Sequence, residues 1–158
     1  MVLLLSHGAA CLAAAPSSPA ALNVQDFGAV GDGVADDTRA FQNALDAARD
    51  DGRGARSLLV PGGRTYLIAG HLHIEIGGDT SFTIASPGMN GAKLLVPGGY
   101  KDTLLTVAMR GGKAGSSGFS VAISGLSFLH GGDDTGGTAL AITTEAVSYT
   151  HLTLPTKA

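Results

Sequence analysis

Two histidines and a glutamate alternate with apolar residues in the segment HLHIEI. Because side chains of a strand alternate between its two faces, His71, His73 and Glu75 would all leave the same face of one strand. A His-x-His pair in this arrangement can ligate a divalent metal ion. No fourth ligand is evident, so we interpret the three residues as the solvent face of a half-buried strand. We assign neither a metal site nor a cofactor-binding site.

A second group of polar residues lies in the glycine-rich segment HGGDDTGG at 130–137, which holds His130, Asp133 and Asp134. Cleavage of a glycosidic bond needs one protonated and one ionised carboxyl group, so paired acids are candidates for this chemistry. Glycine and aspartate are also the residues that tight turns require. We interpret the segment as a loop.

The basic residues Arg110 and Lys113 stand close together in MRGGKAG. Elimination from a uronic-acid polymer would need acidic calcium ligands and a base that removes a proton beside a carboxylate. Glycines rather than acids flank both residues, which favours a solvated loop over a contact with an acidic polymer. The chain also contains no G-x-S-x-G, P-loop or H-E-x-x-H motif. The catalytic residues are therefore unknown from the sequence.

The composition excludes several classes of protein. The formal net charge of −3 and the absence of a Lys/Arg cluster argue against a nucleic-acid-binding surface. The single cysteine, Cys11, excludes an intramolecular disulfide framework and a multi-cysteine zinc site. Glycine accounts for 24 of 158 residues and aromatic residues for only 5%, whereas glycine averages about 7% of residues. This composition indicates short strands separated by tight turns rather than a helical bundle.

Both ends of the chain are expected to lie outside the folded domain, which we place at residues 21–146. Residues 1–20 carry an apolar stretch too short to span a bilayer, as is typical of a secretory signal peptide, although no Lys or Arg precedes Arg39. We therefore expect a secreted protein, extracellular or periplasmic. Lipid attachment at Cys11 is disfavoured because Gly8 stands where a large apolar residue is needed. Residues 147–158 keep no consistent strand face and resemble translated adapter sequence, so we interpret them as a non-native tail.

One segment, Thr38 to Asp50, has helical periodicity. Its apolar residues follow the i, i+3, i+4, i+7 spacing of one helix face, at Phe41, Ala44, Leu45 and Ala48. Asp36 or Asp37 is a suitable N-cap, because a carboxylate can accept hydrogen bonds from the free N–H groups of the first turn. Gly52 is placed to end the helix.

From Ser57 onward the hydrophobic period changes to two, in short runs separated by glycine-rich turns. The residues expected to share inward faces are Tyr66 and Ile68, then Leu72, Ile74 and Ile76, Phe82 and Ile84, Leu94 and Val96, Leu105 and Val107, Val121 and Ile123, Leu126 and Phe128, and Leu140 and Ile142. No helical segment is interposed, so a doubly wound α/β sheet is disfavoured. Asn90-Gly91 is the only two-residue hairpin signal, which favours parallel stacking over a sandwich or barrel.

The segment NVQDFGAVGDGVADDTRAFQNALDAA at 23–48 resembles the opening segment of the pectate-lyase-like right-handed parallel β-helix superfamily. Rhamnogalacturonase-, polygalacturonase- and epimerase-type proteins begin in this way, as do several phage tail-spike depolymerases. The segments LLVPGGRTYLI at 58–68 and ISGLSF at 123–128 resemble strands and turns of its coils, with one extra residue in the turn Gly62-Gly63-Arg64. The resemblance covers about residues 23–145.

This resemblance implies an all-β fold, a right-handed parallel β-helix with an N-terminal capping α-helix. The fold would be truncated at the C-terminus after about four coils of about 20–30 residues. Asp32, Asp36 and Asp37 would be turn and cap residues. In polygalacturonase-type hydrolases an Asn-Thr-Asp strand end lies upstream of the catalytic pair, and no such segment precedes Asp133. We therefore assign no catalytic residue to the 130–137 loop.

The implied function is that of the N-terminal fragment of a secreted polysaccharide-degrading protein, a lyase or glycoside hydrolase acting on pectin-like or other uronate-bearing glycans. The alternative is a non-catalytic carbohydrate-binding, adhesin or tail-spike-like β-helix. The expected partner is an acidic polysaccharide, with no nucleic acid and no membrane. Calcium is expected only if the parent protein is a lyase. The fragment itself is expected to be inactive and to self-associate through its open last coil.

Overall fold

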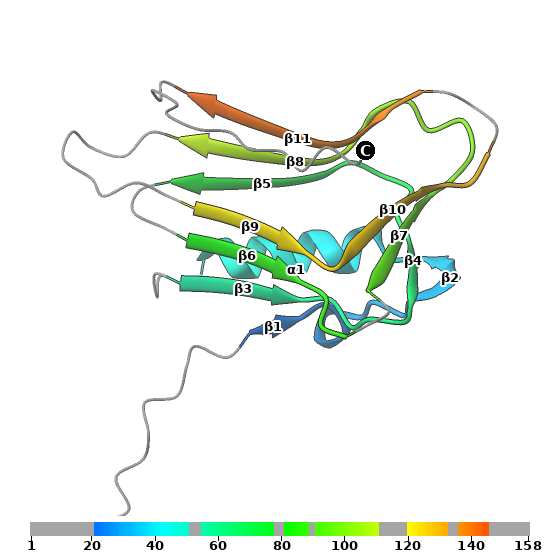
Figure 1. The fold of residues 1–158 in the computed structure, drawn as a ribbon, viewed down its shortest axis with the longest axis horizontal. Helices are drawn as coiled ribbons and strands as arrows, with labels where there is room; N and C mark the ends of the chain where they lie inside the picture. Colours follow the sequence, from blue (N-terminus) through cyan, green and yellow to red (C-terminus); the bar gives the residue numbers. More distant parts are fainter. Residues whose placement is uncertain are drawn as a thin grey trace, which may run out of the picture.

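The computed structural model describes residues 21–50, 55–77, 81–88, 91–110, 120–132 and 136–145, and these form three parallel sheets and one α-helix (Figure 1). Sheet A contains β1 (Leu22–Asn23), β3 (Ala55–Leu59), β6 (Ser81–Ala85) and β9 (Ser120–Ser124). Sheet B contains β2 (Asp32–Asp36), β4 (Thr65–Leu67), β7 (Ala92–Val96) and β10 (Leu126–His130). Sheet C contains β5 (Leu72–Gly77), β8 (Thr103–Arg110) and β11 (Thr138–Glu145). The helices are η1 (Val24–Phe27), a 3-10 helix, and α1 (Thr38–Asp50).

The chain passes through sheets A, B and C in the same order three times, giving coils β3-β4-β5, β6-β7-β8 and β9-β10-β11. Every strand pairing in the described part of the chain is parallel, so the expected parallel stacking is confirmed. This arrangement is consistent with a parallel solenoid. The described residues hold three full coils rather than four. The first coil has the expected length, with 26 residues from Leu58 to its partner Ile84. The next coil is longer than expected, because 39 residues separate Ile84 from Ile123.

The core consists of the inward side chains that stack from one coil to the next. Typical columns are Leu58–Ile84–Ile123, Tyr66–Leu94–Phe128 and Ile74–Val107–Ile142. The members from the first two coils are buried, which confirms the faces predicted from the period of two. In the third coil Ile123 and Phe128 are only partly buried, and Ile142 is 45% exposed. The packing therefore loosens toward the strands β9, β10 and β11, each of which lies at an edge of its sheet.

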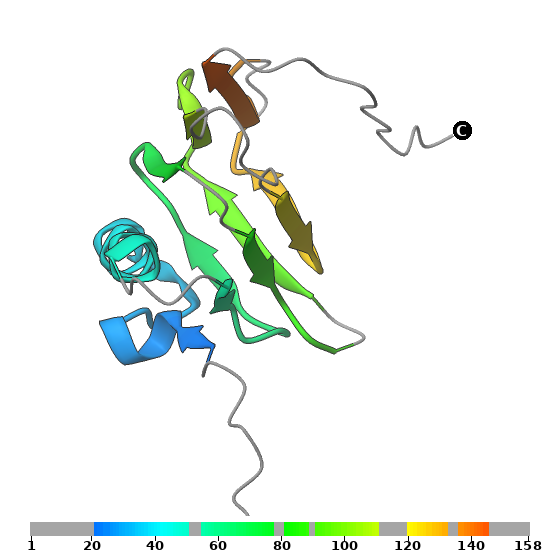
Figure 2. The same ribbon diagram turned by 90° about the vertical axis from the view of Figure 1, so that its left-hand side faces the viewer.

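Helix α1 spans Thr38–Asp50, as its periodicity predicts, and buries the predicted stripe of Phe41, Ala44, Leu45 and Ala48. Phe41 packs edge-to-face on the ring of Tyr66, with centroids 5.1 Å apart. The helix contacts β5, β3 and η1. Figure 2 shows it nearly end-on, beside the first coil.

The amide group of Gln42 joins α1 to the backbone of β5. Gln42 Nε2 donates to the carbonyl oxygen of His73 at 2.9 Å, and the His73 N–H donates to Gln42 Oε1 at 3.0 Å. Strand β5 is an edge of sheet C, so these two bonds satisfy backbone groups that have no neighbouring strand.

The three aspartates before and at the start of α1 have distinct roles. Asp36 Oδ1 accepts a hydrogen bond from the backbone N–H of Thr38 at 3.0 Å. Asp36 therefore provides an acceptor for a free N–H group at the start of the helix, as predicted. The hydroxyl of Thr38, and then its amide, hold the pKa of the Asp36 carboxyl below its ordinary value. Asp32 Oδ1 accepts from two amides of its own turn, and these lower its pKa in the same way.

Asp37 does not cap the helix with its side chain, in contrast to the alternative that the sequence left open. Its carboxylate is buried and accepts hydrogen bonds from the N–H groups of Val30 and Gly31, at 2.7 and 3.1 Å. Gly31 has a φ of +70°, and a Cβ there would lie 2.7 Å from the ring of Tyr66. The buried carboxylate therefore fixes a turn that only glycine can form at this position.

Candidate functional site

The outer face of sheet C carries the histidines singled out from the sequence. His71 and His73 are exposed and Glu75 is half-buried, whereas the alternating residues Leu72, Ile74 and Ile76 are buried. This confirms that the three polar residues occupy the solvent face of a half-buried strand. In the described part of the chain, no three His, Cys, Asp or Glu side chains are arranged so that they could hold a metal ion.

The two imidazoles lie beside a row of small residues. His71 Nε2 is 2.8 Å from the hydroxyl oxygen of Thr106 on β8, and the rings of His71 and His73 have centroids 6.2 Å apart. His73 pairs in register with Thr106, which in turn pairs with Ala141 of β11. The face therefore combines small side chains with imidazole and hydroxyl groups. These groups lie at its β5 side and can donate or accept hydrogen bonds. The sequence could not reveal this grouping, because His71 and Thr106 are 35 positions apart.

A pocket of about 210 Å³ lies where the second and third coils pass from sheet B to sheet C. It is lined by Val96, Tyr100, Asp102, Leu104, Phe128, Leu129, His130, Gly136, Gly137, Thr138 and Ala139. His130 Nδ1 is 3.2 Å from the carbonyl oxygen of Gly132, and within the described residues its Nε2 is buried without a hydrogen-bond partner. The Tyr100 hydroxyl donates to the carbonyl oxygen of Thr103, and burial raises the pKa of Tyr100.

This pocket includes one residue singled out from the sequence and two that sequence reasoning missed. His130 was singled out, whereas Tyr100 and Asp102 follow a PGG turn, and no motif marks them. Asp133 and Asp134 lie outside the described residues, as do Lys113 and Cys11. Arg110 is the last residue of β8, and only its backbone belongs to the described part of the chain.

Among the described residues, no helix has the length and apolar character needed to cross a membrane.

Comparison with known proteins gives a family match over most of the described chain. The profile of the family described as "Rhamnogalacturonase A/epimerase, pectate lyase-like" matches residues 21–121. Mannuronan C5-epimerase AlgE1 of Azotobacter vinelandii is 48% identical over 59 residues, which are 37% of this chain and 4% of the epimerase. Plasmin and fibronectin-binding protein A of Streptococcus pneumoniae is 45% identical over 62 residues, which are 35% of this chain and 8% of that protein.

One solved structure is also similar, the crystal structure of PfbA, a surface adhesin of Streptococcus pneumoniae. Its TM-score is 0.38 at 22% identity, and the match covers 69% of this chain and 33% of that chain. The chain thus spans less than a tenth of the curated relatives named here, and a third of the solved structure.

Proposed function

Because the chain belongs to the rhamnogalacturonase A/epimerase, pectate lyase-like family, we propose that it is the N-terminal part of a secreted right-handed β-helix protein that acts on uronate-bearing polysaccharides. The chemistry of the whole protein would be lyase, hydrolase or epimerase chemistry. The similarity to mannuronan C5-epimerase AlgE1 supports a uronate polymer as the substrate.

The outer face of sheet C carries the proposed contact with the glycan. His71, His73 and Thr106 place imidazole and hydroxyl groups at the solvent surface, where sugar hydroxyls and carboxylates can hydrogen-bond to them. The neighbouring outward residues Ala108 and Ala141 are small, so a pyranose ring can approach the backbone closely. Parallel strands lie about 4.8 Å apart, so a glycan running across sheet C would cross one strand about every 4.8 Å.

In this proposal α1 caps the solenoid at its first coil. The helix lies where a further strand of sheet C would pair with β5, and Gln42 makes the two backbone hydrogen bonds that such a strand would supply at His73. Phe41 and Leu45 are buried, so the helix covers apolar surface as well as hydrogen-bonding groups. An uncovered edge would otherwise pair with other chains.

A non-catalytic surface-binding role is the second candidate. It is supported by the similarity to plasmin and fibronectin-binding protein A, which is as high in identity as the similarity to several epimerases. The two candidates differ in what the outer face of sheet C must do. An enzyme of the proposed kind binds a uronate glycan there, whereas a protein-binding adhesin has no need to.

The proposed glycan contact is tested by binding of a fluorescent oligogalacturonate or oligomannuronate to the full chain. The double variant His71→Ala/His73→Ala should weaken binding about five- to tenfold, because each lost hydrogen bond contributes roughly 0.5–1.5 kcal/mol. His130→Ala removes an imidazole at the pocket and should leave the affinity unchanged. If only His130→Ala weakens binding, or if the full chain binds neither probe, the proposed site on sheet C is wrong.

A further inference from the structure

The pocket at the corner where the second and third coils pass from sheet B to sheet C has no role in the proposed function. Part of its wall is fixed by hydrogen bonds between the two coils. The N–H of Gly131 donates to the carbonyl oxygen of Val96 at 2.8 Å, and the N–H of Thr138 donates to that of Asp102 at 3.2 Å. Because Val96, Asp102 and Thr138 also line the pocket, paired backbone holds its sides in place.

The imidazole of His130 brings an unsatisfied hydrogen-bonding atom to this pocket. Its Nδ1 is 3.2 Å from the carbonyl oxygen of Gly132, and a carbonyl oxygen only accepts, so Nδ1 carries the hydrogen. The neutral ring then leaves Nε2 as an acceptor. Among the side-chain nitrogen and oxygen atoms of the described residues, this Nε2 is the buried atom that has no hydrogen-bond partner. Buried polar atoms nearly always have a partner, so the pocket suits a ligand that supplies an N–H or O–H donor.

The other polar groups of the pocket also accept hydrogen bonds. The Tyr100 hydroxyl uses its hydrogen on the carbonyl oxygen of Thr103 at 3.1 Å, which leaves its oxygen free only to accept. Asp102 carries a carboxylate that forms no ion pair or hydrogen bond with any other residue in the described part of the chain. Burial, and to a smaller extent the negative charge of Asp102, raise the pKa of Tyr100, so this carboxylate lies near the phenol.

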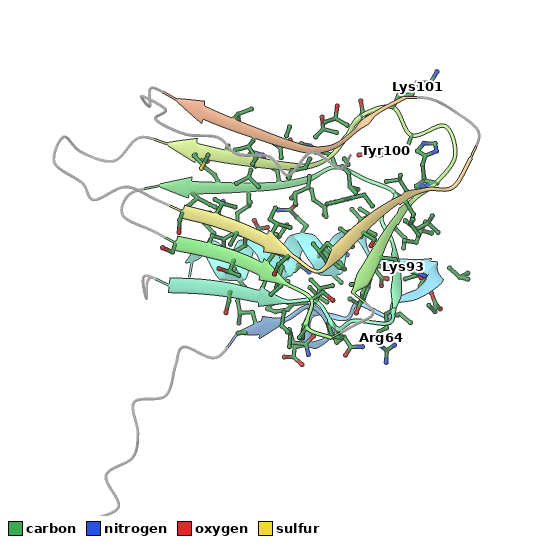
Figure 3. All side chains as sticks on the ribbon, viewed as in Figure 1. Arg64, Lys93, Tyr100 and Lys101 are labelled. Carbon is green, nitrogen blue, oxygen red and sulfur yellow. The ribbon has the colours of Figure 1, made fainter. Side chains whose placement is uncertain are left out.

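The neighbouring lysine does not compensate this negative charge inside the pocket. Lys101 is exposed, and Figure 3 shows its side chain projecting outward from the turn, whereas Tyr100 lies on the inner side of the same turn. The described polar lining therefore favours a positively charged ligand that carries hydrogen-bond donors.

The remaining lining is apolar, and the pocket is small. Val96, Leu104, Phe128 and Leu129 contribute aliphatic and aromatic surface, and aromatic ring faces attract cations. The volume of about 210 Å³ is below the roughly 300–1,000 Å³ of pockets that hold drug-sized ligands. A single ring with a short side chain is the size of ligand that this pocket fits.

We infer that the pocket binds a small organic ammonium ion, whose apolar body lies against Leu104 and Phe128 and whose N–H groups donate to His130 Nε2 and the Asp102 carboxylate. An ammonium group carries donors only, which matches a lining of acceptors. The glycan contact proposed on sheet C depends on other residues, so the two proposals can fail separately.

Titration of the ¹⁵N-labelled full chain with benzylamine, followed by NMR, tests this inference. The amide signal of Thr138 should shift on binding. Asp102→Asn keeps the size of the side chain but removes its charge, and should weaken the binding of benzylamine about five- to tenfold. Asp26→Asn is the matched control, because it makes the same change at an exposed position of η1 and should weaken binding less than about twofold.

Two further probes separate the charge from the ring. Benzyl alcohol has the same ring without the charge and should bind at least about fivefold more weakly than benzylamine, and benzoate should not bind. If benzyl alcohol binds as tightly as benzylamine, if Asp102→Asn and Asp26→Asn bind it equally, or if the Thr138 amide does not shift, the inference is overturned.

His130→Phe tests the second acceptor, because it keeps an aromatic ring but removes Nε2. It should also weaken the binding of benzylamine, and a variant that keeps the wild-type melting temperature and the wild-type affinity would contradict the inference. Asp102 is exposed, so Asp102→Asn leaves the core intact and decides the question even if His130→Phe fails to fold.

Discussion

Replacing Phe41 by aspartate is expected to lower the free energy of unfolding by about 4 kcal/mol or more. The side chain of Phe41 is 3% exposed and packs on Tyr66, which is itself fully buried. The substitution removes a large apolar side chain from this contact and places a carboxylate without a partner in the same space. Truncation of a buried phenylalanine alone typically costs about 3–5 kcal/mol, and the unpaired charge adds to that cost.

Urea titration followed by circular dichroism measures this loss. Asn43→Asp is the matched control, because it introduces the same aspartate at an exposed position of the same helix. Its unfolding midpoint should stay close to that of wild type. If Phe41→Asp and Asn43→Asp unfold at the same urea concentration, α1 does not pack on the first coil as described.

The substitution Asp37→Ala is expected to cost about 2–4 kcal/mol, because it leaves two N–H groups, those of Val30 and Gly31, without their acceptor. Asp37 is 1% exposed, so water cannot replace the carboxylate without opening the turn. Asp37→Asn keeps one acceptor oxygen and should cost less. Thermal unfolding measured by circular dichroism would rank the two variants.

Asp32→Ala is the matched control for this prediction. Asp32 also accepts hydrogen bonds from two backbone amides, of Val34 and Ala35, but these groups lie at the surface. Water can replace the lost acceptor there, so the melting temperature should change little. A drop for Asp32→Ala as large as the drop for Asp37→Ala would show that the burial of Asp37 has no special role in stability.

The features predictable from the sequence are those that depend on neighbours within one element. The bounds of α1 and its buried stripe follow from a local period of 3.6 residues, and the inward faces of the strands follow from a period of two. The role of Asp37 was not predictable in the same way. Its partners Val30 and Gly31 belong to a turn, and the positive φ of Gly31 decides where their N–H groups point.

The grouping of the candidate site residues was also beyond the sequence, because it depends on the register between coils. His73, Thr106 and Ala141 form a row only because β5, β8 and β11 pair in one particular register. Coil lengths vary along the chain, so no fixed repeat reveals that register. The runs YLI and LLV also contain apolar residues on both strand faces, so alternation alone does not show that one leucine of each run points outward.

The central claim is that α1 replaces a strand at the outer edge of sheet C and so caps the first coil. Amide hydrogen exchange at His73 tests it most directly, because the N–H of His73 donates to Gln42 and not to another strand. In the wild-type chain this amide should be protected, and in Gln42→Ala it should exchange about tenfold faster. The amide of Val107, which lies on the central strand of sheet C, should not change. If the His73 amide is unprotected in the wild-type chain, or if its exchange rate is unchanged in Gln42→Ala, the capping role of α1 is contradicted.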